Sequence, residues 1–282
     1  MRHDEYFEQL QMYQLNRHSF TFLLPLFTKH FKTVNTLIIL GLFILFLVSV
    51  QFASAKSVDE VIDKYIERRG GKEKLNAIKS IYMEGRHEMM GKQTTVKIVK
   101  EQNKLSRSEF ETASGIGFNL ITDKEAWNYS PMSMYEPEKI EDALITGLQT
   151  ELDIAGPLVD YVAKGHNTEL TGKENIDDVT CYKIKLVTKE GKSIMYWIET
   201  GSYMLLQSTR VDGMMREEST QRALQNTGRI FTAYKNYKAV EGILFAHSIE
   251  TKTENGEMQN GGTTFEKIEI NKPIDEKLYS PE

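Results

Sequence analysis

The sequence is poor in cysteine and shows no excess of basic residues. Cys181 is the only cysteine among 282 residues, so the chain cannot form an internal disulfide. We interpret Cys181 as a small strand residue, because nothing around it suggests a stabilised thiolate. Lysine plus arginine number 35 and aspartate plus glutamate 40, which gives a net charge of −5. Without a basic stripe, this balance argues against a nucleic-acid-binding protein.

Motifs of common catalytic sites are also missing. The sequence has no G-x-S-x-G turn, no phosphate-binding loop and no paired-cysteine motif. The segment HEMMG begins like a zinc-binding motif at His87, but Gly91 replaces the second histidine. The other histidines beyond residue 55, His166 and His247, are distant in sequence. We expect no metal, no cofactor and no enzymatic activity. An esterase-type site assembled only by the fold is the less favoured alternative.

An uncharged apolar run occupies residues 34–55. Basic residues precede it, and it closes with the small residues Ala53, Ser54 and Ala55. A basic flank, an apolar centre and an A-x-A exit are typical of a secretory signal peptide. We therefore expect an exported protein that is soluble in the periplasm after cleavage. The alternative is an uncleaved anchor in the inner membrane, since the run approaches the length of a membrane span.

The signal peptide divides the chain into three parts. Residues 1–33 are long for the region that precedes a signal, and we interpret them as a disordered extension or a mis-assigned start. Residues 34–55 are the signal peptide, and residues 56–282 are expected to form a single domain. Lys56 occupies the place where a bacterial lipoprotein needs its acylated cysteine, so the mature chain is not expected to be a lipoprotein itself.

A helix is predicted at the start of the mature chain, in the segment SVDEVIDKYIERRGG at 57–71. Ser57 and Glu60 form a capping-box pair at the helix start. The apolar residues that follow fall on one helical face. Gly70 and Gly71 end the helix, because glycine adopts a left-handed conformation without strain.

From about Ser80 the apolar residues recur with a period of two, which is typical of strands. Short segments separated by Gly-, Asn- or Lys-rich turns indicate an antiparallel meander. Strands resume at CYKIKLVT and continue to the C-terminus, and Asn255-Gly256 is a strong hairpin signal. Roughly ten or eleven strands of this kind should curl, because sheet twist accumulates from strand to strand.

Helical signals interrupt the strands between residues 137 and 165. Pro137 suits a helix start, and Leu144 and Leu148 follow it with helical spacing. In LDIAGPLVDYVAKGH, residues 152–166, Gly156 and Pro157 separate two helical pieces. Residues 152–163 carry two apolar stripes, of which one suffices to dock the segment on the sheet. One stripe is Leu152, Ala155, Val159 and Val162, and the other is Ile154, Leu158 and Tyr161. The other stripe contacts a neighbouring helix, or it faces a cavity that a ligand fills.

These patterns predict a mostly β (α+β) fold. A curved antiparallel sheet has a concave face, and the two or three helices are too few to cover it as a full second layer. We expect them to act as a partial plug. The sequence therefore predicts one N-terminal helix, a curved sheet and a short helical lid over part of the concave face.

Three segments resemble the periplasmic outer-membrane lipoprotein-sorting proteins, the LolA/LolB-like family. They are LDIAGPLVDYVAKGH at 152–166, ELTGKENIDDVTCYKIKL at 169–186 and the region from YKNYKAVEG at 234 to the C-terminus. The resemblance implies an unclosed β half-barrel around a helical lid, with an apolar cavity for the acyl chains of lipoproteins. It also implies an inner-membrane exporter and an outer-membrane receptor as partners. A lid-holding arginine belongs to the family pattern, and Arg86 and Arg107 are candidates, although either could be a solvated strand residue.

We therefore expect a periplasmic carrier that binds the acyl chains of lipoproteins, or of a related lipid, for sorting to the outer membrane. The alternative is an envelope sensor or interaction module on the same scaffold, without lipid transport. Gly156 and Pro157 are the predicted hinge of the lid. Core packing is the competing interpretation for the predicted lipid-binding residues, which are Trp127, Tyr129, Met132, Met134, Leu144, Leu148, Ile154, Leu158, Val159, Tyr161, Val162 and Trp197.

Overall fold

The computed structural model describes residues 56–89, 91–132, 134–141, 145, 147–211, 230–253 and 258–282. The predicted N-terminal extension, the predicted signal peptide, Leu144 and the Asn255-Gly256 turn lie outside the described residues. Residues Ser57–Glu282 form one compact unit. Among the described residues, no helix is long and apolar enough to cross a membrane.

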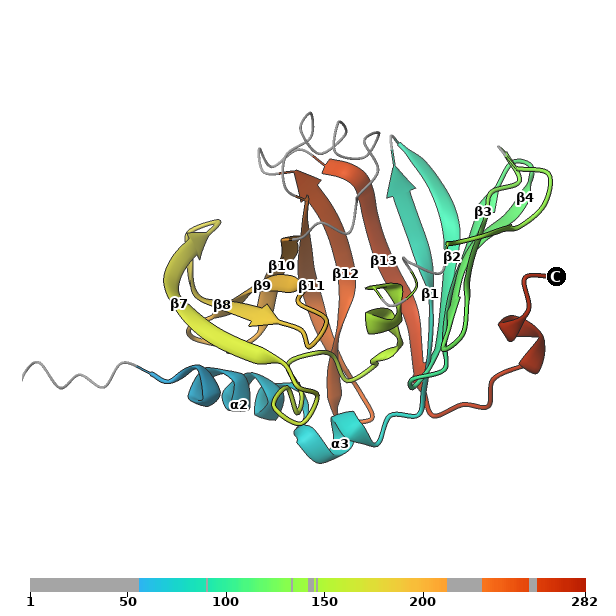
Figure 1. The fold of residues 1–282 in the computed structure, drawn as a ribbon. Helices are drawn as coiled ribbons and strands as arrows, with labels where there is room; N and C mark the ends of the chain where they lie inside the picture. The colour runs from blue at the N-terminus through green and yellow to red at the C-terminus, as the bar shows by residue number, and fades with distance from the viewer. Residues whose placement is uncertain are drawn as a thin grey trace, which may run out of the picture. The chain divides into compact units, whose positions relative to one another are not determined.

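The described strands pair in one curved antiparallel sheet of thirteen strands (Figure 1). Their order is β6-β5-β4-β3-β2-β1-β13-β12-β11-β10-β9-β8-β7, and the edge strands β6 and β7 leave the barrel open. This confirms the predicted fold class. The strands are β1 (Ser80–Met89), β2 (Lys92–Glu101), β3 (Leu105–Thr112), β4 (Gly115–Thr122), β5 (Ala126–Tyr129), β6 (Glu138–Lys139), β7 (Asn167–Ile176), β8 (Val179–Val187), β9 (Ser193–Glu199), β10 (Leu205–Val211), β11 (Ile230–Val240), β12 (Ile243–Thr253) and β13 (Met258–Ile270).

The chain order explains why a segment crosses the open side of the sheet. Strands β1 to β6 form a meander toward one edge, and β7 to β13 form a second meander that starts at the other edge. The second meander returns to the centre, where β13 pairs with β1. The connection from β6 to β7 must therefore run from edge to edge, and it contains η1 (Gln149–Leu152). We call residues 149–166 the lid segment; Figure 1 shows the sheet curving around it.

Two helices precede the sheet. In α2 (Val58–Arg69), the Ser57 side chain accepts a hydrogen bond of 3.1 Å from the Glu60 backbone amide, as the capping prediction requires. Gly70 ends α2 with φ of 128°, and its backbone lies so close to Gly242 that a side chain would collide with the carbonyl there. The helix prediction is therefore confirmed. The short helix α3 (Lys72–Asn76) follows.

The larger core lies on the inner face of the sheet, which we define as the face turned toward α2 and the lid segment. It unites one side of α2, the lid segment and strands from both meanders. Buried members are Val61, Ile62, Tyr65 and Ile66 of α2, Ala155, Leu158 and Val159 of the lid segment, and strand residues such as Ile81, Ile184, Ile198, Phe245 and Ile268.

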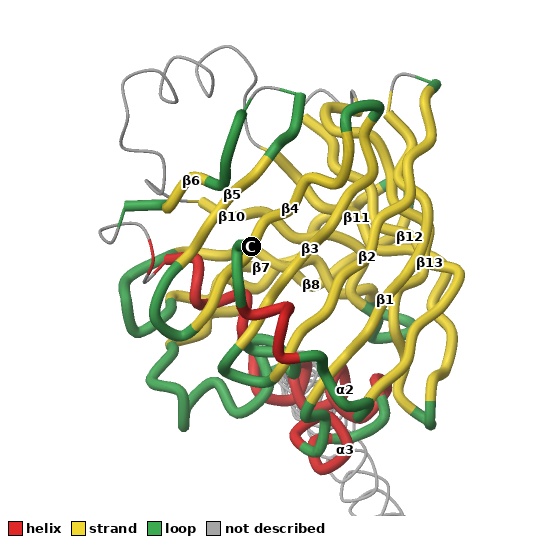
Figure 2. Tube along the Cα trace, turned by 90° about the vertical axis from the view of Figure 1, so that its right-hand side faces the viewer, coloured by secondary structure: helices red, strands yellow, loops and turns green. Residues whose placement is uncertain are grey.

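A smaller core lies on the opposite, outer face of β2 to β5. Its centre is Leu105, Phe118 and Leu120, and the C-terminal segment, with η2 (Glu276–Tyr279), packs against it. Adjacent residues of a strand point to opposite faces, so Ile98 joins the inner core and Val99 the outer one. Figure 2 shows the C-terminal segment running over these strands.

The connection between β6 and β7 follows the predicted pair of helical pieces only in part. Residues 145, 147 and 148 are helical and lead into η1. Pro137 does not start a helix, because Glu138 and Lys139 pair with β5 as the strand β6. Residues 157–165 form successive turns in place of a regular helix. The cause is local: Asp160 has φ of 53°, a left-handed value that a right-handed helix does not accommodate.

Candidate functional site

The inner face of the central strands carries an apolar surface that the core covers incompletely. Met83, Val96, Ile98 and Phe110 are all half-buried there. They belong to two rows of register neighbours, which together we call the inner wall. The first row is Phe265, Gly85, Val96 and Phe110. The second row lies nearer α2 and is Ile268, Met83 and Ile98. The inner wall therefore offers apolar side chains that remain partly accessible beside the core.

The apolar side chains of the lid segment anchor it in the inner core. Leu158 is 3% exposed and Val159 is fully buried, and both pack with α2 and the strands. Ile154 and Tyr161 are half-buried at the margin of the same core. Val162 is 71% exposed and points away from it. Residues of both predicted apolar stripes thus dock the lid segment in the inner core.

Polar bonds fasten the lid segment to α2 and α3. Arg69 donates a hydrogen bond of 3.2 Å to the Ala155 carbonyl. Asn76 donates one of 2.7 Å to the Asp160 carboxylate, which also forms an ion pair with Lys72. Hydrogen bonds from Lys72 and then Asn76 lower the pKa of Asp160 below its ordinary value. All of these bonds lie near the surface, where water can replace them when the segment moves.

A second set of bonds fastens the start of the lid segment to the turn between β2 and β3. The Ile154 amide donates to the Gln102 side chain at 2.8 Å, and the Asn103 amide donates to the Leu152 carbonyl at 3.0 Å. Lys164 closes the segment on itself with a 2.6 Å ion pair to Asp153. The lid segment is therefore held at both ends by hydrogen bonds and between them by apolar burial.

The predicted hinge has the backbone freedom that a hinge requires. Gly156 has φ of 93°, a value that residues with side chains rarely adopt. The ring of the next residue, Pro157, fixes the φ of that residue. Arg69 contacts the carbonyl of Ala155, directly before this glycine. The two arginines considered from the sequence lie elsewhere: Arg86 pairs with Glu266 on the outer face, and Arg107 binds the C-terminal segment.

The predicted aromatic residues of the strands, Trp127, Tyr129 and Trp197, lie on the outer face, away from the lid segment. Trp197 lies between Tyr196 and Ile198, which both belong to the inner core, so its ring points outward. There it packs against Phe231, with the two ring centroids 5.6 Å apart. Trp127 and Tyr129 pack against the outer core. The structure therefore does not bring these aromatic residues together with the lid segment.

The other predicted residues are spread along the connection that precedes the lid segment. Met132 is 70% exposed in the loop between β5 and β6, and Met134 is half-buried in the same loop. Leu148 is half-buried just before η1. Their role in ligand contact remains a prediction, as does that of Leu144.

The inner-wall residues were missed by the sequence analysis. The signal was present in SIYMEGRHE, where Ile81, Met83, Gly85 and His87 alternate with polar or charged residues. A strand with this alternation has one face turned inward, and three of these four residues are apolar or small. Methionine at position 83 was therefore a better candidate than the isolated methionines of the loop at 130–137.

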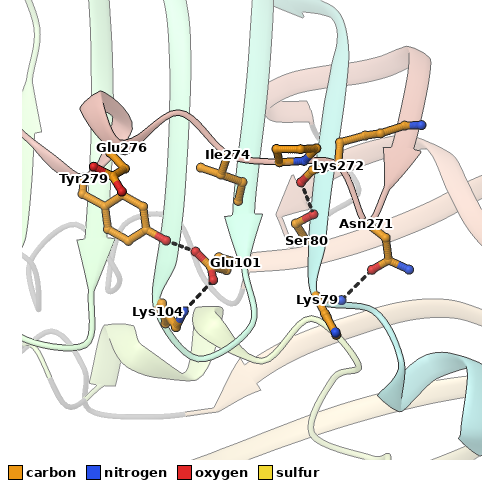
Figure 3. A pocket seen from close by; sticks show the side chains of 10 residues that line it. Lys79, Ser80, Glu101, Lys104, Asn271, Lys272, Ile274, Glu276 and Tyr279 are labelled. Atoms are coloured by element: carbon orange, nitrogen blue, oxygen red, sulfur yellow. Dashed lines mark hydrogen bonds and ion pairs between the residues drawn. The ribbon is translucent and has the colours of Figure 1, made fainter.

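The C-terminal segment builds a polar pocket on the outer side. The Tyr279 hydroxyl donates a hydrogen bond to the Glu101 carboxylate, which also forms a 2.7 Å ion pair with Lys104 (Figure 3). The pocket measures about 620 Å³ and is lined with charges of both signs. Arg107 fixes the same segment, donating to the Ser280 carbonyl at 2.8 Å, and lies over the Phe118 ring. This region holds the chain end in place.

Within the described residues, no group of three or more His, Cys, Asp or Glu side chains is placed to hold a metal ion. Cys181 lies buried in β8, as interpreted from the sequence, and burial raises the pKa of its thiol to about 11. A thiol with a raised pKa is a weak nucleophile.

The sequence matches no protein-family model and no curated protein. Several solved structures are similar at low identity. A LolA superfamily protein from Nitrosomonas europaea is 15% identical, with 80% of this chain and 98% of that chain covered and a TM-score of 0.48. A DUF1329 family protein from Desulfovibrio piger is 13% identical, with coverages of 80% and 98% and a TM-score of 0.49. An outer membrane lipoprotein-sorting protein domain from Vibrio parahaemolyticus is 12% identical, with coverages of 78% and 94% and a TM-score of 0.45.

The names of these structures match the family that the sequence resembles. At identities this low, the function of this chain has to be argued from its own site.

Proposed function

We propose that this protein is an exported carrier that binds the acyl chains of a lipoprotein, or of a related lipid, between the inner wall and the lid segment. The observation that carries the proposal is the path of the lid segment. It joins opposite edges of an open curved sheet, and its buried side chains place it on the inner face, beside half-buried apolar side chains. An inner-membrane exporter and an outer-membrane receptor are the partners that this role would need.

The energetics favour an acyl chain as the ligand. Each methylene group removed from water contributes about 0.8 kcal/mol, so ten methylenes contribute roughly 8 kcal/mol before the cost of opening the lid segment. That cost includes exposing Leu158 and Val159, at about 1.5–3 kcal/mol for each side chain. A long chain therefore offsets the opening more fully than a small apolar molecule does.

Release follows from the same balance. The bonds that Arg69, Lys72 and Asn76 make to the lid segment are peripheral, and Gly156 supplies a backbone position that tolerates rotation. When a partner removes the acyl chain, the lid segment regains its contacts in the inner core. Loading and unloading then alternate between two arrangements of one segment, with the sheet unchanged.

A substitution on the inner wall tests the proposal. Val96→Trp places a large ring among Met83, Ile98 and Phe110, and should weaken the binding of an environment-sensitive apolar dye by at least about tenfold. Lys97→Trp is the matched control, because its side chain is exposed on the opposite face of the same strand. Equal dye affinity in the two variants, both folded by circular dichroism, would contradict the inner wall as the binding surface. Mass spectrometry of protein taken from the cell envelope should in addition find co-purified lipid.

A further inference from the structure

A row of five side chains, four of them polar, borders the inner wall on the side farther from α2. Tyr234, Ile249, Thr263, His87 and Thr94 are register neighbours across β11, β12, β13, β1 and β2. All five are half-buried. The His87 ring contacts the Thr263 hydroxyl at 2.9 Å, and the Tyr234 hydroxyl contacts that of Ser208 at 3.0 Å. We call these five residues the polar row.

The inner face therefore changes character along the strands. The polar row presents hydroxyl groups and an imidazole, and the next two rows toward α2 form the inner wall, whose members on β13, β1 and β2 are all apolar or glycine. A ligand with an apolar chain and a polar end would match this sequence of surfaces in one orientation only. The chain would lie toward α2 and the polar end at the polar row.

The charge of this face is the second part of the argument. None of the side chains in the polar row or the inner wall is a carboxylate, lysine or arginine. On the outer face of the same strands, Arg86 pairs with Glu266 at 3.0 Å and Lys235 with Glu250 at 2.7 Å. The next inward lysine toward α2, Lys100, binds Glu151 of the lid segment.

Because a charged group is costly to remove from water, the absence of charged side chains disfavours charged ligands. A phosphate that loses water without gaining a cation is strongly disfavoured, whereas an ester or amide carbonyl needs only a hydrogen-bond donor. Tyr234 and Thr263 supply such donors when Ser208 and His87 donate to their hydroxyl oxygens, whereas the Thr94 hydroxyl already donates to the Glu111 carbonyl. We propose that the polar row holds an uncharged ester- or amide-linked junction, of the acylglycerol type, and discriminates against phospholipids. This inference rests on the proposed carrier function and specifies its ligand.

The test compares two lipids with the same chains. Dioleoylglycerol should displace the apolar dye from the wild-type protein at a concentration at least about tenfold lower than dioleoyl phosphatidic acid does, because only the second lipid brings a charge to the polar row. Thr263→Val should weaken dioleoylglycerol binding about three- to tenfold, the effect of one lost hydrogen bond, with dye affinity unchanged. Tyr234→Phe provides an independent second variant with the same expectation.

Two further variants complete the design. Thr264→Val is the matched control, since Thr264 is exposed on the outer face beside Thr263 and should have no effect. Thr263→Lys places a cation in the row and should raise the affinity for dioleoyl phosphatidic acid about tenfold. If the wild-type protein binds both lipids with similar affinity, or Thr263→Val and Tyr234→Phe behave like Thr264→Val, the polar row is not the junction site and the carrier function stands. If neither lipid nor the dye binds, both proposals fail.

Discussion

At the scale of single residues, Asp160 links lid conformation to charge. Its left-handed backbone interrupts the predicted helix, and its carboxylate joins the lid segment to α3 through Asn76 and Lys72. Aspartate and asparagine are the side chains that tolerate this backbone region best. One residue therefore sets both the shape of the lid segment and one of its surface bonds.

Replacing Asp160 with asparagine separates these two roles. Asp160→Asn keeps the tolerance for positive φ and removes the ion pair with Lys72. Because the pKa of Asp160 is lowered in the folded state, its contribution to stability is present above the ordinary carboxyl pKa and is lost as pH falls through the lowered value. The variant should melt roughly 1–3 °C below the wild type at neutral pH, and the two melting temperatures should converge at acid pH.

Melting curves followed by circular dichroism across this pH range are the measurement. Asp178→Asn is the control, because Asp178 also has positive φ but lies in the turn between β7 and β8. A constant difference between Asp160→Asn and the wild type at every pH would mean that the lowered pKa does not stabilise the fold.

Arg107 is a second residue with a role that its sequence context does not reveal. It is 7% exposed, pairs with Glu109 at 2.8 Å and donates to the Ser280 carbonyl. Arg107→Met keeps the apolar packing on Phe118 but removes these bonds. We expect a loss of about 1–3 kcal/mol in the free energy of unfolding and faster removal of the C-terminal residues by carboxypeptidase.

Arg86→Met provides the comparison for this prediction. Arg86 also forms an ion pair with a glutamate, but its side chain is 64% exposed, so the free energy of unfolding should change by less than about 0.5 kcal/mol. Equal effects of the two substitutions in urea unfolding would show that burial of Arg107 is not what makes it important.

At the scale of elements, the lid segment is the part whose movement the proposed function requires. Asn76→Cys together with Asp160→Cys places two thiols where the wild-type side chains meet, and a cleavable bis-thiosulfonate reagent can join them. The joined protein should take up the apolar dye at least about tenfold more slowly, because the open arrangement becomes unpopulated. Reductant should restore the original rate.

The single-cysteine variants, treated with the same reagent, control for labelling alone. Cys181 is fully buried and should not compete for the reagent. Unchanged dye uptake in the joined protein would show that the ligand reaches the inner wall without movement of this segment.

At the scale of the whole molecule, the topology was only partly predictable. The two-residue period indicated strands, and their number indicated a curled sheet. The pairing of β13 with β1 was not predictable, since it joins strands more than 150 residues apart and no local signal encodes such a contact. That pairing places the start of β7 at the edge opposite β6 and so requires the connection to run from one edge to the other, and the apolar side chains of the lid segment bring it onto the inner face.

The sequence by itself determined the helix at 58–69, most of the strands and the curved mostly β class, because capping, turn and alternation signals act over a few residues. Thirteen strands form where ten or eleven were expected, and β6 takes the place of a predicted helix start. Tertiary structure decided which face of each strand is inner. In β9 both faces are buried, so Tyr196, Trp197 and Ile198 form a continuous apolar run without a readable direction. The strand residues Trp127, Tyr129 and Trp197 chosen from the sequence accordingly lie on the outer face, and the inner wall became visible only through strand register. Alternation assigns residues to two faces, but only packing against α2 and the lid segment makes one of those faces the inside.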